Sequence, residues 1–263
     1  MADERPAETT RIVRIEAARG PVWGLISNRE VLELVGRPEL DACTTSGSLG
    51  PLDELELLAP AEPSKIVCVG RNYAAHAAEH GAEVPSEPLL FLKPPSAIIG
   101  PHAPIVLPEL SAQVEHEAEI GLVIGSRCRR VTEDDAWRHV LGITCANDVT
   151  ARDLQRSDSQ WTRGKGFDSF CPLGPWIETG LSEEQVCGLR LTCRVNGELR
   201  QEVDTSRMVF RPSVLIAYIT QVMTLNPGDV VLTGTPSGVS PLHAGDRVSV
   251  AVEGVGELVN PVA

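Results

Sequence analysis

VEHEAEIGLVIG, at residues 114–125, joins closely spaced glutamates to an apolar run. Side chains on a strand alternate between its two faces, so Glu115, Glu117 and Glu119 would share one face. Residues 120–124 have the composition of a buried strand. Because neighbouring carboxylates repel one another and strands disfavour glutamate, acids at the mouth of such a strand require a compensating cation.

The acidic strand has a second interpretation, which the strand alone favours: a solvated edge with one acidic face. Asp148 changes this preference, because it ends another apolar strand, LGITCAND, at residues 141–148. Carboxylate oxygens without cysteine or paired histidine ligands suit Mg²⁺, Mn²⁺ or Ca²⁺ and not Zn²⁺. The two strands together therefore predict a site for a hard divalent cation.

Composition limits the class of protein. The chain has 263 residues, 42% of them hydrophobic, enough for one large domain or one domain with a small appendage. Its net charge of −13 disfavours nucleic acid as a partner but leaves small anionic substrates open. The N-terminus lacks an apolar signal region, and no run is long enough to span a bilayer. We therefore expect a soluble, cytoplasmic protein without a membrane partner.

The chain changes character near Pro63, after a segment rich in Ser, Gly and Pro. We predict a small N-terminal β-rich subdomain at residues 1–63 and a larger domain at residues 64–263. Within the first, RIVRIEA and GPVWGLISN indicate a hairpin bent at Gly20 and Pro21, followed by a helix near residues 29–35.

The larger domain is rich in short strands. The sequence also predicts a helix ended by Gly81, a hairpin turning at Asn196 and Gly197, and a helix around residues 212–222. The fold class is therefore mixed α+β and strand-rich, with loops carrying polar residues to one rim.

Seven cysteines are spread along the chain without a CxxC pair, and most lie within apolar runs. In a cytosolic protein such cysteines are typical of small buried hydrophobic side chains. We predict this role for Cys43, Cys68, Cys128, Cys145, Cys171, Cys187 and Cys193.

Three further segments carry polar residues, each with two interpretations. NDVTARDLQ, at residues 147–155, indicates a strand end entering a helix, which would place Asp148, Arg152 and Gln155 on one face. A solvated helix face is the alternative. Lys165 lies between two glycines and either contacts a carboxylate or developing enolate, or is a flexible surface residue. The turn at residues 234–237 either cradles an anion or simply reverses the chain.

Six motifs occur in order: VGRNYAAH, EPLLFLKPPSAIIGP, VEHEAEIGLVIG, NDVTARDLQ, KGFDSFCPLGP and LTGTPSGV. With this set, the chain from residue 65 onward resembles the fumarylacetoacetate hydrolase (FAH) family, in particular bacterial 2-hydroxyhepta-2,4-diene-1,7-dioate isomerases and acylpyruvate hydrolases. About the first sixty residues resemble the small β-rich subdomain of many bacterial members. The resemblance implies an FAH-type β-roll core, commonly a homodimer, with one Mg²⁺ or Mn²⁺ per subunit and Ca²⁺ as an alternative occupant in a crystal.

The resemblance also implies roles for single residues. The matching metal ligands are Glu117, Glu119 and Asp148, and Glu115 would lie behind them or face solvent. The positions matching substrate contacts are Arg152, Gln155 and Lys165, with Lys165 stabilising negative charge, Gly234 and Thr235 forming an anion-binding turn, and Arg71 holding a polar end of the substrate. His76 and Glu79 match a water-activating dyad on a mobile lid, whereas His80 and His102 match no family position.

The implied function is a divalent-metal-dependent enzyme that acts on small 2-oxo or 1,3-diketo acids through a metal-bound enolate. The intact dyad favours C–C bond hydrolysis of an acylpyruvate of the fumarylpyruvate type. Isomerisation or tautomerisation of 2-hydroxyhepta-2,4-diene-1,7-dioate type, as in aromatic compound catabolism, and decarboxylation of oxaloacetate use the same groups and remain alternatives.

Two other classes are disfavoured. A catalytically idle binding module would be expected to lose at least one of these site residues, and all are present. A zinc hydrolase would require histidine and cysteine ligand sets that the sequence pattern does not indicate.

Overall fold

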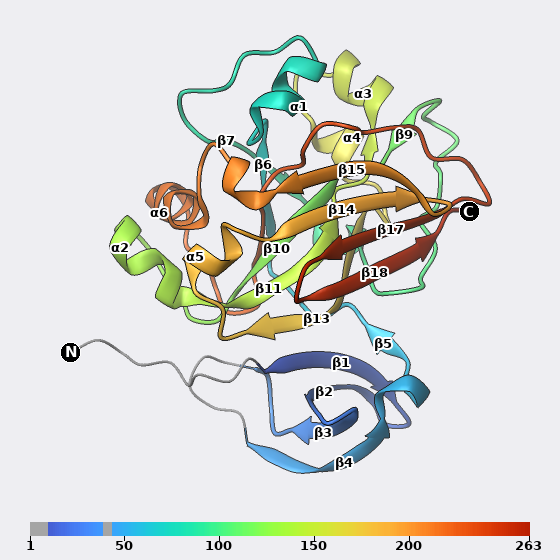
Figure 1. The fold of residues 1–263 in the computed structure, drawn as a ribbon, viewed down its shortest axis with the longest axis vertical. Coiled ribbons are helices and arrows are strands. Elements are labelled where there is room, and N and C mark those ends of the chain that lie inside the picture. The colour runs from blue at the N-terminus through green and yellow to red at the C-terminus, as the bar shows by residue number, and fades with distance from the viewer. Residues whose placement is uncertain (1–9, 39–43) are drawn as a thin grey trace.

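The structure is a computed structural model that describes residues 10–38 and 44–263. Its strands form one large mixed sheet, a four-stranded sheet and a two-stranded ribbon. The large sheet has the strand order β4-β3-β2-β1-β13-β11-β10-β16-β6-β7. Figure 1 shows β1 to β4 as a lobe at one end of the molecule and the remaining elements as the main body. The predicted strand-rich α+β fold of the FAH type is confirmed.

The N-terminal lobe is a β-meander. Its strands are β1 (Arg11–Ala17), β2 (Gly20–Ser27), β3 (Glu30–Leu34) and β4 (Thr45–Pro51), with β5 (Leu57–Leu58) pairing to β1. Strand β1 also pairs with β13, with Ile12 opposite Ile177, so the meander continues the main sheet. The subdomain boundary at residue 63 stays a prediction.

The predicted helix near residues 29–35 is wrong, because this segment is strand β3. Asn28 and Arg29 both have positive φ, as a two-residue type I′ turn requires, and Ser27 pairs with Glu30 across it. The first hairpin bend also differs from the prediction, since Ala17 pairs with Gly20 and the turn lies just before Gly20 and Pro21.

The main body supplies five strands of the large sheet that are almost entirely buried: β6 (Ile66–Gly70), β10 (Ala118–Ile124), β11 (Val140–Asn147), β13 (Cys171–Thr179) and β16 (Val230–Leu232). Burial on both faces explains why these strands are continuous apolar runs with little alternation. Strand β7 (Leu89–Lys93) ends the sheet beside β6 and is only partly buried. The short strand β8 (Ile98–Ile99) pairs with β13.

The four-stranded sheet packs against β10, β11 and β13 and encloses the largest hydrophobic core. Its strands are β14 (Arg190–Val195), β15 (Glu198–Asp204), β17 (Arg247–Val252) and β18 (Gly256–Pro261). The predicted hairpin is confirmed, because Asn196 and Gly197 join β14 to β15 with positive φ.

The predicted helix at residues 212–222 is confirmed as α6 (Pro212–Val222). The other helices are short: α1 (Ala74–Glu79), α2 (Glu133–Ala136), α3 (Arg152–Ser157), α4 (Thr162–Lys165) and α5 (Glu183–Val186). Figure 1 places α1, α3 and α4 together at the end of the main body opposite the N-terminal lobe.

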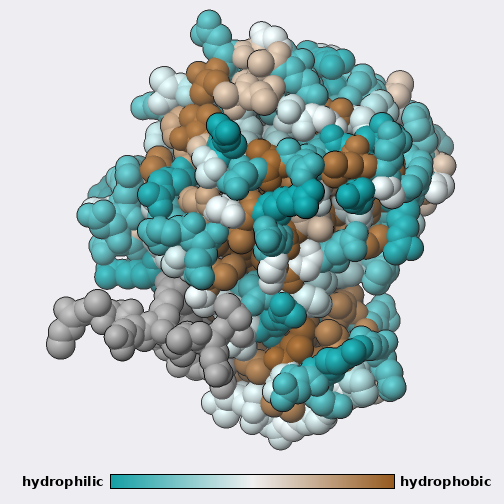
Figure 2. Space-filling view, in the orientation of Figure 1, coloured by the Kyte–Doolittle hydropathy of each residue, from teal (hydrophilic) through white to brown (hydrophobic). Residues whose placement is uncertain are grey.

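The described cysteines are free thiols, and five of them are buried as predicted: Cys68, Cys128, Cys145, Cys171 and Cys193. Cys187 is partly exposed, and Cys43 lies outside the described residues. The face in Figure 2 is largely hydrophilic, with hydrophobic residues in small groups. Within residues 10–38 and 44–263, none of the helices has the length and apolar character needed to cross a membrane.

Close packing between β11 and β13 gives a stability prediction. A Cβ atom added at Gly142 would lie 2.3 Å from the carbonyl oxygen of Glu178. We expect Gly142→Ala to lower the free energy of unfolding in urea by about 1–3 kcal/mol. The matched control is Gly47→Ala in β4, where an added Cβ meets nothing within 4 Å, and its change should stay within about 0.5 kcal/mol. Equal unfolding midpoints for the two variants would contradict this account.

Candidate active site

The ends of several central strands meet at one edge of the large sheet. Strands β10 and β11 are antiparallel, with Ala118 opposite Asn147. One residue beyond this pair, Glu117 lies opposite Asp148, and the Asp148 backbone N–H donates to the Glu117 carbonyl oxygen at 2.9 Å. Strand β16 pairs with β10 and runs parallel to β6, so the turn containing Gly234 reaches the same edge. Strand register thus gathers acids that are distant in sequence.

The acidic segment is two strands and not one. Strand β9 (Val114–Glu115) pairs with β12 (Thr150–Ala151). Residues 116–117 belong to neither strand, and β10 begins at Ala118. The exposed fractions of Glu115, Glu117 and Glu119 are only 4%, 4% and 2%. An exposed acidic edge is therefore excluded, and of the two places expected for Glu115, behind the ligands or facing solvent, the second is excluded.

The cluster of buried carboxylates has the composition of a hard-cation site. One oxygen each from Glu117, Glu119 and Asp148 lie within 4.8 Å of one another. Oxygen-only donor sets of this kind fit Mg²⁺, Mn²⁺ or Ca²⁺. Among the described residues, Glu119 receives one hydrogen bond, from the Gly234 N–H at 2.6 Å, which leaves its charge largely uncompensated. The residues present therefore fit a divalent cation.

Buried cations hold the carboxylates in position. The Lys165 ammonium donates to Glu117 Oε2 at 2.7 Å and to Asp148 Oδ2 at 2.6 Å. Arg152 donates from Nη2 to Glu117 Oε1 at 2.5 Å and from Nε to Glu115 Oε2 at 2.7 Å. Lys165 is 2% exposed, so the flexible surface lysine considered above is excluded.

Lys93 is a site residue that the sequence pattern did not indicate. Its ammonium donates to Asp148 Oδ1 at 2.6 Å and to the Val149 carbonyl oxygen at 3.1 Å, and it is fully buried. Lys93 ends the apolar strand β7, just as Asp148 follows the apolar strand β11. A charge at the end of an apolar strand was the signal that could have revealed it.

The electrostatics of the acids differ sharply. Burial raises the pKa of Glu117, but the charges of Lys165 and Arg152 outweigh it, so the pKa of Glu117 is lowered. Burial also raises the pKa of Glu119, and the neighbouring charges of Asp148 and Glu117 raise it further. Burial alone would lower the pKa of Lys165, but Asp148 and Glu117 raise it above its ordinary value. Glu119 is thus the acid that most requires an added cation.

The predicted helical face of Asp148, Arg152 and Gln155 is wrong in its geometry, because α3 begins at Arg152. Asp148 reaches the same pocket from the end of β11. Arg152 Nη1 donates to Gln155 Oε1 at 2.5 Å, so these two residues do form a pair. Since Arg152 already binds three neighbours, its main contribution is to position the carboxylates and Gln155.

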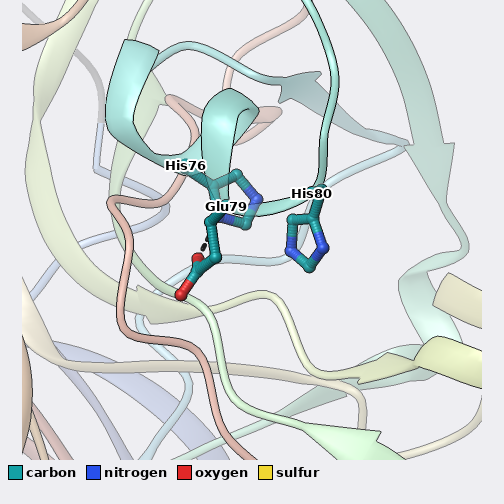
Figure 3. A group of neighbouring side chains, drawn as sticks. All are labelled: His76, Glu79 and His80. Carbon is teal, nitrogen blue, oxygen red and sulfur yellow. Dashed lines mark hydrogen bonds and ion pairs between the residues drawn. The ribbon is translucent and has the colours of Figure 1, made fainter.

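Helix α1 brings the predicted dyad to the pocket. His76 Nδ1 lies 3.3 Å from Glu79 Oε2, and the Gly238 N–H donates to Glu79 Oε1 at 3.0 Å. Burial lowers the pKa of His76, although Glu117 and Glu79 oppose this effect. His76 is therefore a neutral imidazole near pH 7. His80 follows one turn later, and Figure 3 shows the three side chains together beneath α1.

The turn after β16 is held rigidly. Gly234 has a φ of 96°, and an added Cβ there would lie 2.7 Å from Asn72 Cβ, so glycine is required. Gln201, another residue that the sequence did not indicate, donates from Nε2 to Thr235 Oγ1 at 2.8 Å and accepts from the Ala118 N–H at 3.0 Å. The Thr235 hydroxyl accepts this bond, so its own proton can be donated to another group.

These groups line one cavity of about 510 Å³. Its wall contains Arg71, which makes no hydrogen bond or ion pair with any described residue and has a positive φ of 57°. The cavity brings together all the site residues expected from the sequence except Gly234, whose N–H binds Glu119 beside it. Their roles in binding or catalysis stay predictions.

A strand-rich fold with buried carboxylates at a sheet edge, facing a histidine–glutamate pair, is the architecture of a small-molecule enzyme. Residues 65–263 match the family described as fumarylacetoacetate (FAA) hydrolase C-terminal, and residues 10–60 match the one described as Rv2993c-like, N-terminal. The chain belongs to the fumarylacetoacetate hydrolase family.

Several relatives resemble most of the chain. Protein Rv2993c of Mycobacterium tuberculosis is 49% identical over 219 residues, 83% of each protein. Oxaloacetate tautomerase FAHD2B, mitochondrial, of Bos taurus is 46% identical over 222 residues, 81% of this chain and 71% of that protein. The solved structure of 2-hydroxyhepta-2,4-diene-1,7-dioate isomerase from Mycobacterium marinum is 42% identical, with a TM-score of 0.88 covering 97% of this chain and 98% of that one.

The carboxylate cluster gives a binding prediction. We expect Glu119→Gln to weaken Mn²⁺ binding by at least about 100-fold, because an amide lacks the charge that the site supplies to the cation. Free Mn²⁺ can be followed by electron paramagnetic resonance during a titration. Glu109→Gln, at an exposed position, is the control and should bind Mn²⁺ like the unaltered protein. Equal affinities for Glu119→Gln and the control would exclude Glu119 as a ligand.

The raised pKa of Glu119 predicts how the stability of metal-free protein depends on pH. The folded-state pKa lies above the ordinary value of 4.5, so this carboxyl stabilises the fold at low pH and loses that contribution as pH rises. Glu119→Gln removes the titration. With a chelator present, the unfolding free energy of this variant relative to the unaltered protein should increase as pH rises above the ordinary carboxyl pKa of 4.5. A constant difference, as expected for Glu109→Gln, would refute the pKa assignment.

Proposed function

We propose that this protein is a Mg²⁺- or Mn²⁺-dependent isomerase that catalyses keto–enol proton transfer in small 2-oxo dicarboxylic acids of the oxaloacetate type. The observation that carries the proposal is a neutral histidine, oriented by a carboxylate, in the same cavity as a buried acidic cluster. Relatives with 46% and 42% identity that are named as a tautomerase and an isomerase support this reaction class.

Glu117, Glu119 and Asp148 would hold the cation. When bound, the cation would polarise the carboxylate and 2-oxo oxygens of the substrate. Lys165 stays charged between Glu117 and Asp148, and it would stabilise negative charge that develops on the substrate oxygen. Lys93 and Arg152 donate hydrogen bonds to Asp148 and Glu117, respectively, and so keep the carboxylate oxygens oriented.

His76 is proposed to carry the proton. Glu79 accepts the Nδ1–H of His76, which leaves the Nε2 lone pair available as a base. His76 would take the proton from the carbon next to the 2-oxo group, and the electrons of that C–H bond would form the C=C bond of the enol. Return of the proton to a substrate oxygen or carbon restores the histidine. The cycle needs neither water nor an oxidant.

The polar cavity also contains groups that could bind a second carboxylate of the substrate. Arg71 is the cation of the wall without a protein partner among the described residues, and Thr235 keeps a hydroxyl proton to donate. We propose that these groups bind the carboxylate farther from the cation. Arg152 is less suited to this task, because Glu115, Glu117 and Gln155 already occupy it.

Hydrolysis of an acylpyruvate is the second candidate, because it can use the same His76–Glu79 pair. The same base could remove a proton from water, and the hydroxide would then attack the distal carbonyl. This route differs from isomerisation in breaking a C–C bond and consuming water, so the products distinguish the two.

A substrate panel tests the reaction type. Oxaloacetate, fumarylpyruvate and 2-hydroxyhepta-2,4-diene-1,7-dioate are each mixed with the Mn²⁺-loaded protein, and enol absorbance, pyruvate and carbon dioxide are followed separately. We expect a faster absorbance change without pyruvate or carbon dioxide. Pyruvate from fumarylpyruvate would support hydrolysis instead, and carbon dioxide from oxaloacetate would support decarboxylation. No acceleration with any compound would contradict an enzymatic role on these acids.

Replacement of the proposed base gives a kinetic prediction. His76→Gln should lower the rate of proton transfer by about 10²–10⁴-fold, because it removes the base while leaving the carboxylate cluster intact. Its Mn²⁺ affinity should remain unchanged in the same titration. His243→Gln, at an exposed loop position, is the matched control and should keep full activity. Unchanged turnover of His76→Gln would remove His76 from the reaction.

A further inference from the structure

We propose that His76, Glu79 and His80 form a second cation site, suited to zinc, and that zinc bound there inhibits the enzyme. The sequence H-A-A-E-H at residues 76–80 places His76 and Glu79 at i and i+3 of α1 and His80 directly after the last residue of the helix. Figure 3 shows His76 and Glu79 in contact below the helix, with the His80 ring beside His76.

The spacing of the donor atoms fits a small cation. One ligand atom from each of the three residues lies within 4.8 Å of the others. Tetrahedral zinc with bonds of about 2.0–2.1 Å keeps its ligand atoms about 3.3 Å apart. His76 Nδ1 and Glu79 Oε2 are already 3.3 Å apart. The His80 ring lies 4.7 Å from the His76 ring between centroids, so a side-chain rotation of His80 would complete the set.

The donor types separate this site from the acidic cluster. Two imidazole nitrogens and one carboxylate oxygen are a donor set that zinc accepts with a fourth position left for water. The acidic cluster offers only carboxylate oxygens, which suit Mg²⁺ and Mn²⁺. The two sites in one cavity would therefore prefer different cations, zinc at the histidines and Mg²⁺ or Mn²⁺ at the carboxylates.

The surroundings support the site in two further ways. The Gly238 N–H fixes Glu79 through Oε1 and leaves Oε2 facing His76, as an orienting partner of a metal ligand does. His76, Glu79 and His80 also line the same cavity, so a cation that enters it can reach all three side chains.

Inhibition follows from the identity of the ligands. Zinc bound to His76 Nδ1 would leave the ring proton on Nε2, so Nε2 would have no lone pair with which to accept a proton from the substrate. Glu79, itself a zinc ligand, could then no longer accept the Nδ1–H. The inhibitory effect rests on the proposed function, whereas the binding of zinc does not. Binding and turnover must therefore be measured separately.

The binding experiment uses Glu119→Gln, in which the acidic cluster is disabled, as the starting protein. Zinc is titrated against a chromophoric chelator. We expect one zinc per chain in Glu119→Gln and at least about tenfold weaker binding in Glu119→Gln/His80→Gln, since loss of a ligand costs at least what loss of its orienting partner does. Glu119→Gln/His243→Gln is the matched control and should keep the site. Equal zinc affinity in all three proteins would overturn the proposal.

The activity experiment uses the full chain with saturating Mg²⁺ and the substrate identified by the panel. His80→Gln should keep its basal rate, and half-inhibition should require at least about tenfold more zinc than in the unaltered protein. Equal inhibition of both proteins would mean that zinc acts by displacing Mg²⁺ from the acidic cluster, which contradicts the inhibitory role. Zinc binding lost in His80→Gln without any zinc inhibition of the unaltered protein would keep the site but reject His76 as the base.

Discussion

The burial of like charges is the constraint on which the rest of this structure depends. Four acids lie in the interior beside one another: Glu115, Glu117, Glu119 and Asp148. Such groups are tolerated only when cations and hydrogen bonds compensate them. Lys93, Lys165 and Arg152 pair with three of the acids, and Glu119 receives a hydrogen bond from the Gly234 N–H. Buried ion pairs are a weak source of stability, because desolvation offsets their attraction. Their value here is to orient oxygens that would otherwise repel one another.

The two-sheet core makes this arrangement possible. The register of β10 on β11 sets Glu117 beside Asp148, and β16 brings the Gly234 N–H to Glu119. From the four-stranded sheet, Gln201 bonds both the start of β10 and the turn after β16. The apolar interior between the sheets holds these segments in one register, since a slip by one residue would turn every side chain to the other face.

Local signals predicted much of the fold and part of the site. The Asn196–Gly197 turn and helix α6 follow from short-range chemistry, and the acids at strand mouths required a cation. The segment at residues 29–35 was mistaken for a helix because its strand character comes from pairing with β2 and β4. Lys93 was missed for a similar reason. Its partner Asp148 is 55 residues away, and only the folded sheet brings the two together.

The reaction type depends on the groups across the cavity and not on the acidic cluster. A cation held by carboxylates activates any 2-oxo acid in the same way, whether a proton, a carboxylate or an acyl group then leaves. Under the proposed function, the choice depends on the base that faces the cation and on the access of that base to carbon or to water. His76 and Glu79 stand on a helix of only six residues, tied to the opposite turn by the Gly238 N–H. Differences in this short helix could therefore change the reaction while the buried acids stay the same.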